Sequence, residues 1–214
     1  MDADSVEIRV LGCLIEKQAT TPDAYPLTLK ALTTACNQSS SRDPVMSVTE
    51  HTVETTVLAL KALGYARVVY PGSGERATKY RHVADEVLGL DDAKRALLGL
   101  LFLRGPQTAA ELRMRAERMH PFATTGEVED VLRAMEGHEP PLVQRYERIG
   151  SEREGRWGQI VADEAVPLEA RASAGAAGGN GPGGGSGRSD RLAELEARVS
   201  ALEEKLAELR ALLE

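Results

Sequence analysis

Residues 47–83 read SVTEHTVETTVLALKALGYARVVYPGSGERATKYRHV and contain the pattern that decides the fold. Ser47 and Glu50 stand three residues apart, as in a capping box, and predict the start of a helix that ends at Gly64. The apolar residues of this helix recur at helical spacing: Val53, Val57, Leu60 and Leu63. Residues 65–70 and 78–83 are rich in β-forming residues, and the Pro-Gly-Ser-Gly turn between them predicts a β-hairpin.

Two further helices are expected upstream of this segment. Residues 4–18 carry apolar residues at helical spacing, and a second helix is expected to begin near Pro26, because proline suits the first helical position. Three helices followed by a hairpin is the order of a winged helix-turn-helix module. Residues 4–84 are therefore predicted to form a first winged-helix domain.

The same order recurs downstream with little sequence identity. Asp91, Thr108 and Thr124 each precede an amphipathic segment and predict three helix starts. Residues 142–146 and 156–161 are predicted strands with a second wing between them. Residues 90–164 are therefore predicted to form a second winged-helix domain. The predicted fold class is mainly α with small β-hairpins (α+β), built as two winged helix-turn-helix domains in tandem.

A glycine-rich segment and a heptad repeat complete the chain. Residues 166–189 contain too much glycine to bury an apolar core and are predicted to be a flexible linker. Residues 190–214 are predicted to form a coiled-coil helix. Its dimerisation seam would consist of Leu192, Leu195, Val199, Leu202, Leu206, Leu209 and Leu213. This seam predicts a homo-oligomer, most simply a dimer. The alternative is that the helix docks back onto the body of its own chain.

Composition and charge narrow the class of protein. The 214 residues carry a net charge of −7, which weakens the expectation of tight, non-specific DNA binding, because phosphate contacts need basic groups. The only two cysteines, Cys13 and Cys36, are expected to be buried thiols rather than zinc ligands. The chain contains no bilayer-length apolar run and its polar N-terminus does not resemble a signal peptide. We therefore expect a cytoplasmic protein without membrane contact.

Double-stranded DNA and a basic protein are the two partners that fit this architecture. In DNA-binding winged helices, the third helix enters the major groove and the wing contacts phosphate. The candidate residues for contacting nucleic acid or another partner are Asn37, Gln38, Arg42, Arg76, Lys79, Arg81, Arg148 and Arg153. The exposed charges of both predicted third helices are mainly acidic, which opposes groove binding and suits a basic partner. The alternative for the basic residues is a solvated surface with helix-stabilising ion pairs. For Arg42, which stands beside Asp43, a further alternative is a local salt bridge or a fastener of the turn.

Catalytic and cofactor-binding patterns are not found in the sequence. No two of its four histidines share a helix at metal-ligand spacing. The sequence shows no Ser-His-Asp arrangement, phosphate-binding glycine loop or supported pair of carboxylates. We therefore expect a protein that is not an enzyme and that needs neither a metal nor a cofactor.

Several stretches carry a family resemblance over most of residues 5–162. They are TTPDAYPLTL at 20–29, ACNQ at 35–38, RDPVM at 42–46, RGPQT at 104–108 and RMHPF at 118–122. In these stretches the chain resembles the YceH-like family of uncharacterised bacterial proteins. The resemblance implies two winged-helix domains, often followed by a coiled coil, and it supplies no activity. The chain departs from the family pattern at residues 39–41, where three serines replace a version with lysine and asparagine.

These observations support two hypotheses about function. The leading hypothesis is a dimeric winged-helix protein that associates with DNA or regulates transcription. The alternative is a winged-helix scaffold for protein–protein interaction without DNA binding, in which the acidic third helices form the docking surface. Salt dependence separates the two, because binding through phosphate contacts weakens steeply as salt rises.

Overall fold

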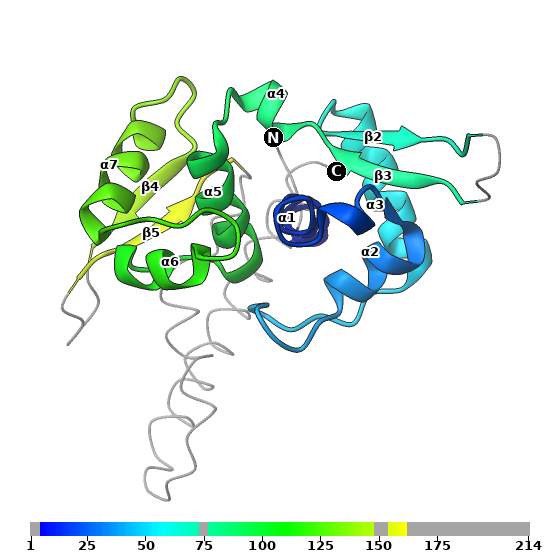
Figure 1. The fold of residues 1–214 in the computed structure, drawn as a ribbon, viewed down its shortest axis with the longest axis horizontal. Coiled ribbons are helices and arrows are strands. Elements are labelled where there is room, and N and C mark those ends of the chain that lie inside the picture. The colour runs from blue at the N-terminus through cyan, green and yellow to red at the C-terminus, as the bar shows by residue number, and fades with distance from the viewer. Residues whose placement is uncertain (1–4, 73–76, 148–153, 162–214) are drawn as a thin grey trace, which may run out of the picture. The chain divides into compact units, whose positions relative to one another are not determined.

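The first half of the chain combines short helices with a small sheet (Figure 1). The computed structural model describes residues 5–72, 77–147 and 154–161. In chain order the elements are α1 (Ser5–Thr20), the 3-10 turn η1 (Pro22–Ala24), β1 (Leu27–Thr28), α2 (Leu29–Cys36), α3 (Glu50–Ala62), β2 (Ala66–Val69) and β3 (Lys79–His82). The three predicted helices and the predicted hairpin are therefore present.

Strand β1 is an element that the sequence pattern did not indicate. The sheet is antiparallel with the order β1-β3-β2, and Tyr80 of β3 pairs with Leu27 on one side and Val68 on the other. Because residues 27 and 28 pair with β3, α2 begins at Leu29 and not near Pro26. The side chain of Thr28 then accepts a hydrogen bond from the Ala31 backbone N–H and caps the helix.

The second half repeats the order of the first. After α4 (Ala84–Leu88), its elements are α5 (Asp92–Arg104), α6 (Ala109–Ala116), α7 (Thr125–Glu136), β4 (Val143–Tyr146) and β5 (Arg156–Gln159). Gln107 occupies the place that β1 has in the first half. Its backbone N–H donates to the Trp157 carbonyl at 2.9 Å, and its carbonyl accepts from the Trp157 N–H at 2.7 Å. Both halves therefore place the last strand of the hairpin between two neighbours.

Helix starts follow from local capping. Asp91, Thr108 and Thr124 each accept a hydrogen bond from a backbone N–H three residues on, as predicted. The predicted capping box of Ser47 and Glu50 is wrong. Thr49 is the N-cap of α3, because its hydroxyl accepts from the Thr52 N–H at 3.1 Å and Glu50 is already the first residue of the helix.

Helices α1 and α5 pack directly against each other at two glycines. A Cβ atom on Gly12 would lie 2.9 Å from Cβ of Phe102, and one on Gly99 would lie 2.7 Å from Cγ2 of Ile15. The contact is reciprocal, because Ile15 and Phe102 each stand three residues after the glycine of their own helix. A pair of helices related by two-fold symmetry produces such reciprocity. The two halves therefore share one core across this crossing.

Replacing Gly99 with alanine is expected to lower the free energy of unfolding by about 1–2 kcal/mol. The added methyl group would overlap Ile15, and this overpacking outweighs the better helix propensity of alanine. Gly126→Ala in α7 is the matched control, since its nearest neighbour, the Thr124 hydroxyl oxygen, is 3.7 Å from the new Cβ. That control is expected to stabilise by up to about 1 kcal/mol. Urea unfolding measures the free energy of unfolding of both variants. If alanine stabilises the protein equally at the two positions, the tight packing of α1 against α5 is contradicted.

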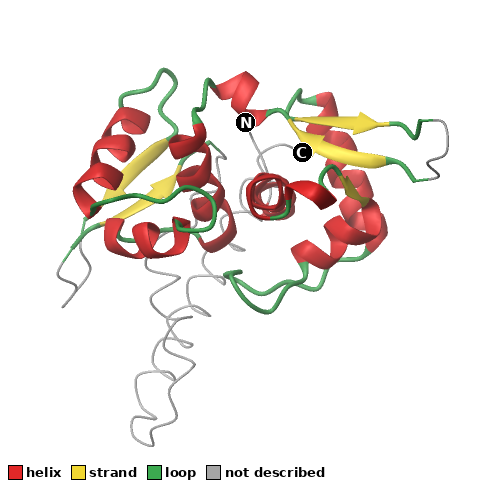
Figure 2. Ribbon diagram, viewed as in Figure 1, coloured by secondary structure: helices red, strands yellow, loops and turns green. Residues whose placement is uncertain are grey.

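The fold class of mixed helix and small antiparallel sheets is confirmed (Figure 2). The part of the chain that the structure describes contains seven α-helices and five short strands. Among these helices, none combines the length and the apolar composition that crossing a lipid bilayer requires. The division into two winged-helix domains stays a prediction. The predicted linker and the predicted coiled coil lie outside the described residues.

Candidate functional site

Arg42 lies in the interior, and its guanidinium uses all five of its N–H groups. Nε donates to the Ala35 carbonyl at 3.0 Å. Nη1 donates to Glu16 Oε1 at 3.0 Å and to the Ser41 carbonyl at 2.9 Å. Nη2 donates to Glu16 Oε2 at 2.6 Å and to Gln38 Oε1 at 2.7 Å. The side chain has no exposed surface and no N–H left to donate, so it is not available to a phosphate group.

Arg42, which is fully buried, and Glu16, which is partly buried, form a bidentate ion pair. Burial alone would raise the pKa of Glu16, but the hydrogen bonds and the charge of Arg42, together with Lys17 at 3.2 Å, hold that pKa below its ordinary value. Burial alone would lower the pKa of Arg42, but the hydrogen bond to Glu16 and the charges of Cys13, Glu16 and Cys36 together outweigh burial, so this pKa is raised. Both groups therefore stay charged, and the pair fastens Arg42 to α1.

The loop between α2 and α3, residues 37–49, is held at two further points. The Asn37 side-chain amide donates to the Val48 carbonyl and accepts from the Val48 N–H, both at 2.8 Å. Arg9, which is also buried, donates from Nη1 to the Cys36 carbonyl at 3.2 Å and from Nη2 to the Pro44 carbonyl at 2.6 Å. The predicted contact residues Asn37, Gln38 and Arg42 thus come together, but as internal fasteners of this loop.

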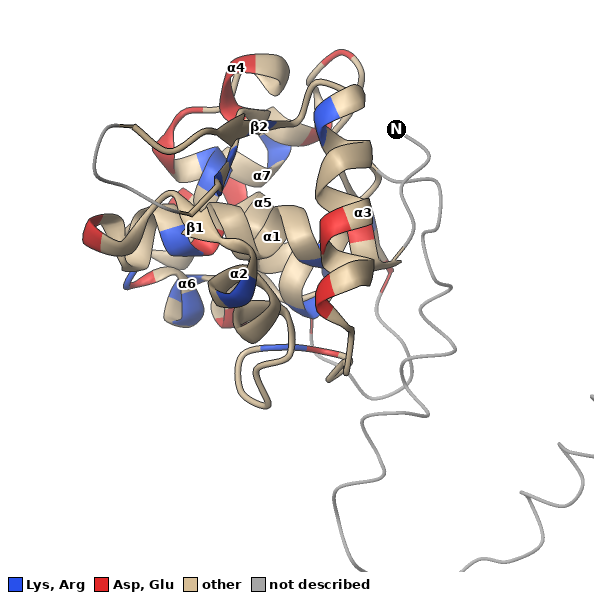
Figure 3. Cartoon of the chain, turned by 90° about the vertical axis from the view of Figure 1, so that its right-hand side faces the viewer, with Lys and Arg blue, Asp and Glu red and all other residues tan. Residues whose placement is uncertain are grey.

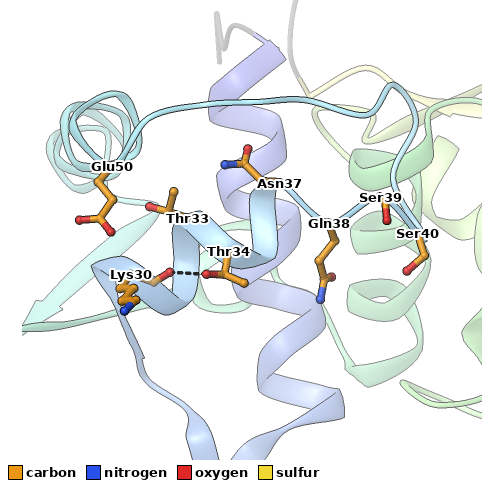
Figure 4. A pocket seen from close by; sticks show the side chains of 8 residues that line it. All are labelled: Lys30, Thr33, Thr34, Asn37, Gln38, Ser39, Ser40 and Glu50. Carbon is orange, nitrogen blue, oxygen red and sulfur yellow. Dashed lines mark hydrogen bonds between the residues drawn. The ribbon is translucent and has the colours of Figure 1, made fainter.

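An open polar hollow of about 550 Å³ lies between α2 and the start of α3 (Figure 4). It is lined by Lys30, Thr33, Thr34, Asn37, Gln38, Ser39, Ser40 and Glu50. The Thr34 hydroxyl donates to the Lys30 carbonyl, and Lys30 and Glu50 bring charges of opposite sign. The lining does not select one ligand chemistry. Across the described residues, no three metal-ligating side chains gather to hold an ion.

The predicted wing residues are divided between β3 and segments outside the structure. Lys79 and Arg81 lie on β3. Nη1 of Arg81 is 3.6 Å from a carboxylate oxygen of Glu86, which also binds Arg67 at 3.0 Å. Arg76, Arg148 and Arg153 lie outside the described residues, as do all seven residues of the predicted dimerisation seam. The structure therefore places only Lys79 and Arg81 of the predicted wing contacts, on an element different from the loop 37–49.

Arginines of the second half are likewise bound to groups of the chain itself. Arg113 donates to the carbonyls of Phe122 and Ala123. Arg115 donates to the buried Gln107 side chain at 2.6 Å, while Arg156 binds Glu111 at 2.9 Å. Glu111 in turn completes the capping box of α6. These cations stabilise turns and helix ends of their own chain.

The exposed charged residues of α3 and α7 are mainly acidic. Figure 3 shows α3 with both acidic and basic residues, and its one exposed lysine or arginine is Lys61. On α3 the exposed residues include Glu50, Glu54 and Leu58, and Leu63 follows at the C-terminal end. Leu58 and Leu63 are 46% and 51% exposed, so this face adds apolar surface to its acidic groups. On α7 the exposed acids are Glu127, Asp130 and Glu136. The only basic residue of α7, Arg133, pairs with Glu129 at 2.8 Å and with Asp130 at 3.3 Å.

Sequence reasoning missed Arg9 and Glu16, the two residues of α1 that hold the loop. The signal was present in their spacing. Arg9, Cys13 and Glu16 follow one another at intervals of four and three, so they share one face of the helix. Because that face also belongs to the predicted buried stripe, two charged residues within it indicate internal partners.

A family model and individual relatives match this chain, and they point to the same family. The family model described as "Protein of unknown function, DUF480" matches residues 3–152. A UPF0502 protein from Citrifermentans bemidjiense is 45% identical over 215 residues, which cover 98% of this chain and 94% of the relative. A UPF0502 protein from Geobacter sulfurreducens is 49% identical over 161 residues, which cover 75% of this chain and 73% of the relative. The similarity therefore spans both halves.

Proposed function

This chain belongs to the DUF480 (UPF0502) family of uncharacterised bacterial proteins, and from that premise we propose that it is a non-enzymatic adaptor that binds a basic protein partner. The partner would dock on the outward faces of α3 and α7. Each half would be a winged helix-turn-helix module, and the C-terminal heptad repeat would pair two chains in the cytoplasm. The proposal needs neither a metal nor a cofactor.

The order of the elements supports the winged-helix modules. In the first half, three helices precede a hairpin whose last strand lies between β1 and β2. The second half has the same order, with the bridge between Gln107 and Trp157 in place of β1. In this arrangement α3 and α7 are the third helices, the elements that winged-helix proteins offer to their targets.

One observation carries the choice of a protein partner over DNA. Arg42 is fully buried on Glu16 and Arg156 binds Glu111, whereas the exposed charged residues of the third helices are mainly carboxylates. Carboxylates repel a phosphate backbone and attract lysine and arginine side chains. Leu58 and Leu63 supply apolar contact beside the acids of α3, and protein interfaces typically combine an apolar centre with a polar rim.

Pairing of two chains would strengthen such binding. A coiled coil that joins two chains brings four acidic third helices to one partner or assembly. A second contact then becomes intramolecular, which raises the overall affinity without any new kind of contact. Since the heptad seam lies outside the described residues, this part of the proposal depends on the sequence pattern alone.

Charge reversal on α3 tests the docking surface. We expect Glu50→Lys with Glu54→Lys to weaken binding of the partner at least about tenfold, because the reversal replaces attraction by repulsion across the interface. Glu117→Lys with Asp23→Lys makes the same change of charge at two exposed residues outside α3 and α7 and is the matched control. Partners captured by the full chain are identified by mass spectrometry, and their affinities are then measured with the purified proteins. Equal affinity of the two charge variants for the same partner would refute docking on α3.

Leu202→Glu is a further arm of the same experiment. A charge in the middle of the seam would separate the chains, so we expect light scattering to show a monomer. The monomer should bind a partner with several sites more weakly than the pair does, while its affinity for a single site stays unchanged. If the wild-type chain is already monomeric, pairing is refuted, and the proposal then consists of docking on the acidic faces alone.

DNA association remains a second candidate, because Lys79 and Arg81 lie on the strand that leads from the predicted wing. The test is fluorescence anisotropy with a random DNA duplex at low salt. Binding that weakens steeply with rising salt, and that is lost when Lys79 and Arg81 are both replaced by alanine, would establish this candidate. No binding at micromolar protein would leave the adaptor as the function.

A further inference from the structure

Two thiols lie in the interior where α1 meets the end of α2. Cys13 stands in the middle of α1, and Cys36 is the last residue of α2. Both are free and have no exposed surface. They are the only two cysteines among the 214 residues, so this chain can form one intrachain disulfide and no other.

Contacts on both sides of Cys13 place it beside Cys36. One turn before it on the same face of α1, Arg9 donates to the Cys36 carbonyl at 3.2 Å. One turn after it, Glu16 binds Arg42, which donates to the Ala35 carbonyl at 3.0 Å. The stretch of α1 between these contacts therefore faces the last residues of α2. Both thiols belong to the same buried core, at the place where these two helices meet.

Two buried guanidinium groups flank the thiols. The Nε atom of Arg9 is buried and has no hydrogen-bond partner within the described structure. Burial alone would raise the pKa of Cys13. The interaction with the Cys36 thiol and the charges of Arg42 and Arg9 together outweigh burial and the opposing charge of Glu16, so the pKa of Cys13 is lowered. The interaction with the Cys13 thiol and burial raise the pKa of Cys36. Cys13 is therefore the thiol that ionises first, and thiolates are the reactive form.

We propose that Cys13 and Cys36 form a peroxide-sensitive dithiol, which a hydroperoxide converts into an intrachain disulfide that joins α1 to the end of α2. This role is independent of the proposed docking surface. Other proteins respond to oxidants through pairs of this kind, in which one cysteine reacts and a neighbouring cysteine resolves the product. The neighbouring cations suit Cys13 to the role of the reacting cysteine. Cys36 is the one other cysteine of the chain and would resolve the product.

The reaction balances with hydrogen peroxide as the oxidant. The Cys13 thiolate attacks one peroxide oxygen and the O–O bond breaks. Hydroxide is the leaving group, and Cys13 becomes a sulfenic acid. The Cys36 sulfur then attacks the sulfenic sulfur, the S–O bond breaks, and the hydroxide that leaves takes up the Cys36 proton as water. Two thiols and one peroxide thus yield one disulfide and two waters. Since both thiols are buried, peroxide must reach them through a local opening of the fold.

A disulfide at this position would act on the loop that leads to α3. Cys36 immediately precedes Asn37, the first residue of the loop 37–49. Arg9 holds the same loop through Pro44 at 2.6 Å. Oxidation would therefore add a covalent bond to the segment that Arg9, Arg42 and Asn37 already fasten, and reduction would release it.

The mass of the full-length wild-type chain tests the proposal. The reduced protein is treated with hydrogen peroxide under native conditions, quenched with acid, unfolded and treated with N-ethylmaleimide. We expect a chain that takes up no maleimide, has a mass about 2 Da below the reduced form and regains two reactive thiols with dithiothreitol. In Cys36→Ser, dimedone should label Cys13, whereas Cys36 in Cys13→Ser should stay unlabelled. Circular dichroism checks that both variants are folded.

Three outcomes would overturn the proposal. The first is two maleimide groups on the peroxide-treated wild-type chain, which means that neither thiol has reacted. The second is a disulfide between chains, visible as a dimer on a non-reducing gel. The third is a disulfide that forms only at urea concentrations that unfold the chain, because the folded structure would then play no part in the reaction.

Discussion

Replacing Arg42 with methionine is expected to lower the free energy of unfolding by about 3–5 kcal/mol, the usual cost of breaking a buried ion pair from one side. The substitution leaves the partly buried Glu16 with only Lys17 as a charged partner. It also removes the donors to the Ala35 and Ser41 carbonyls and to Gln38. Urea unfolding at neutral pH, followed by circular dichroism, measures the change.

Arg67→Met is the matched control for this prediction. Arg67 also binds a carboxylate, Glu86, but both side chains are more than half exposed. Exposed pairs contribute little, so we expect a loss below about 1 kcal/mol. Adding Glu16→Gln to Arg42→Met should cost less than the sum of the single changes, because the two residues share one interaction. A loss for Arg42→Met as small as for Arg67→Met would show that the buried pair does not hold the loop.

Lowering the pH from 6.5 to 4 is expected to remove roughly 3 kcal/mol of stability through His82 alone. This side chain is buried at the end of β3, with its Nε2 hydrogen-bonded to Gln18 Oε1. Burial is the main cause that lowers its pKa from 6.5 to about 4. The charge of Asp85 opposes this shift, and the charges of Arg95 and Arg81 add to it. The folded state therefore keeps the ring neutral while the unfolded state takes up a proton. The contribution of His82 is complete above pH 6.5 and is lost as the pH falls toward 4.

His82→Gln should flatten this pH dependence, because glutamine can still bond to Gln18 but does not take up a proton. The measurement is the free energy of unfolding at several pH values between 7 and 4. His51→Gln removes an exposed histidine of α3 and serves as the control. The ion pair of Glu16 weakens in a separate range, below pH 4.5, since the pKa of that carboxyl is lowered on folding. An unchanged slope in His82→Gln would show that other groups cause the loss.

The two halves of the chain are joined by side-chain packing and by a backbone hydrogen bond. The crossing of α1 and α5 at Gly12 and Gly99 provides the packing. Close to it, the Asp43 N–H donates to the Leu103 carbonyl at 2.9 Å, so the loop that Arg42 anchors also contacts the second half. Destabilising either feature is therefore expected to affect both modules together, and unfolding should follow a single transition.

The sequence by itself determined the local elements of this fold. Asp91, Thr108 and Thr124 mark helix starts because a short polar side chain satisfies a free N–H three residues on, and that bond needs no distant partner. Apolar spacing likewise defined the helices and the hairpins, and the α+β class followed from their order. The acidic faces of α3 and α7 were also readable, because helical periodicity shows which residues face outward.

Only the tertiary structure decided the role of Arg42, the existence of β1 and the crossing at Gly12 and Gly99. From the sequence, Arg42 was a candidate contact for phosphate, with a local salt bridge to Asp43 or a turn fastener as the alternative. Its partner Glu16 lies 26 residues earlier, and no local spacing connects the two. Strand β1 exists because β3, about 50 residues on, pairs with it. Such contacts depend on how distant segments meet, whereas capping and periodicity act within a few residues of one another.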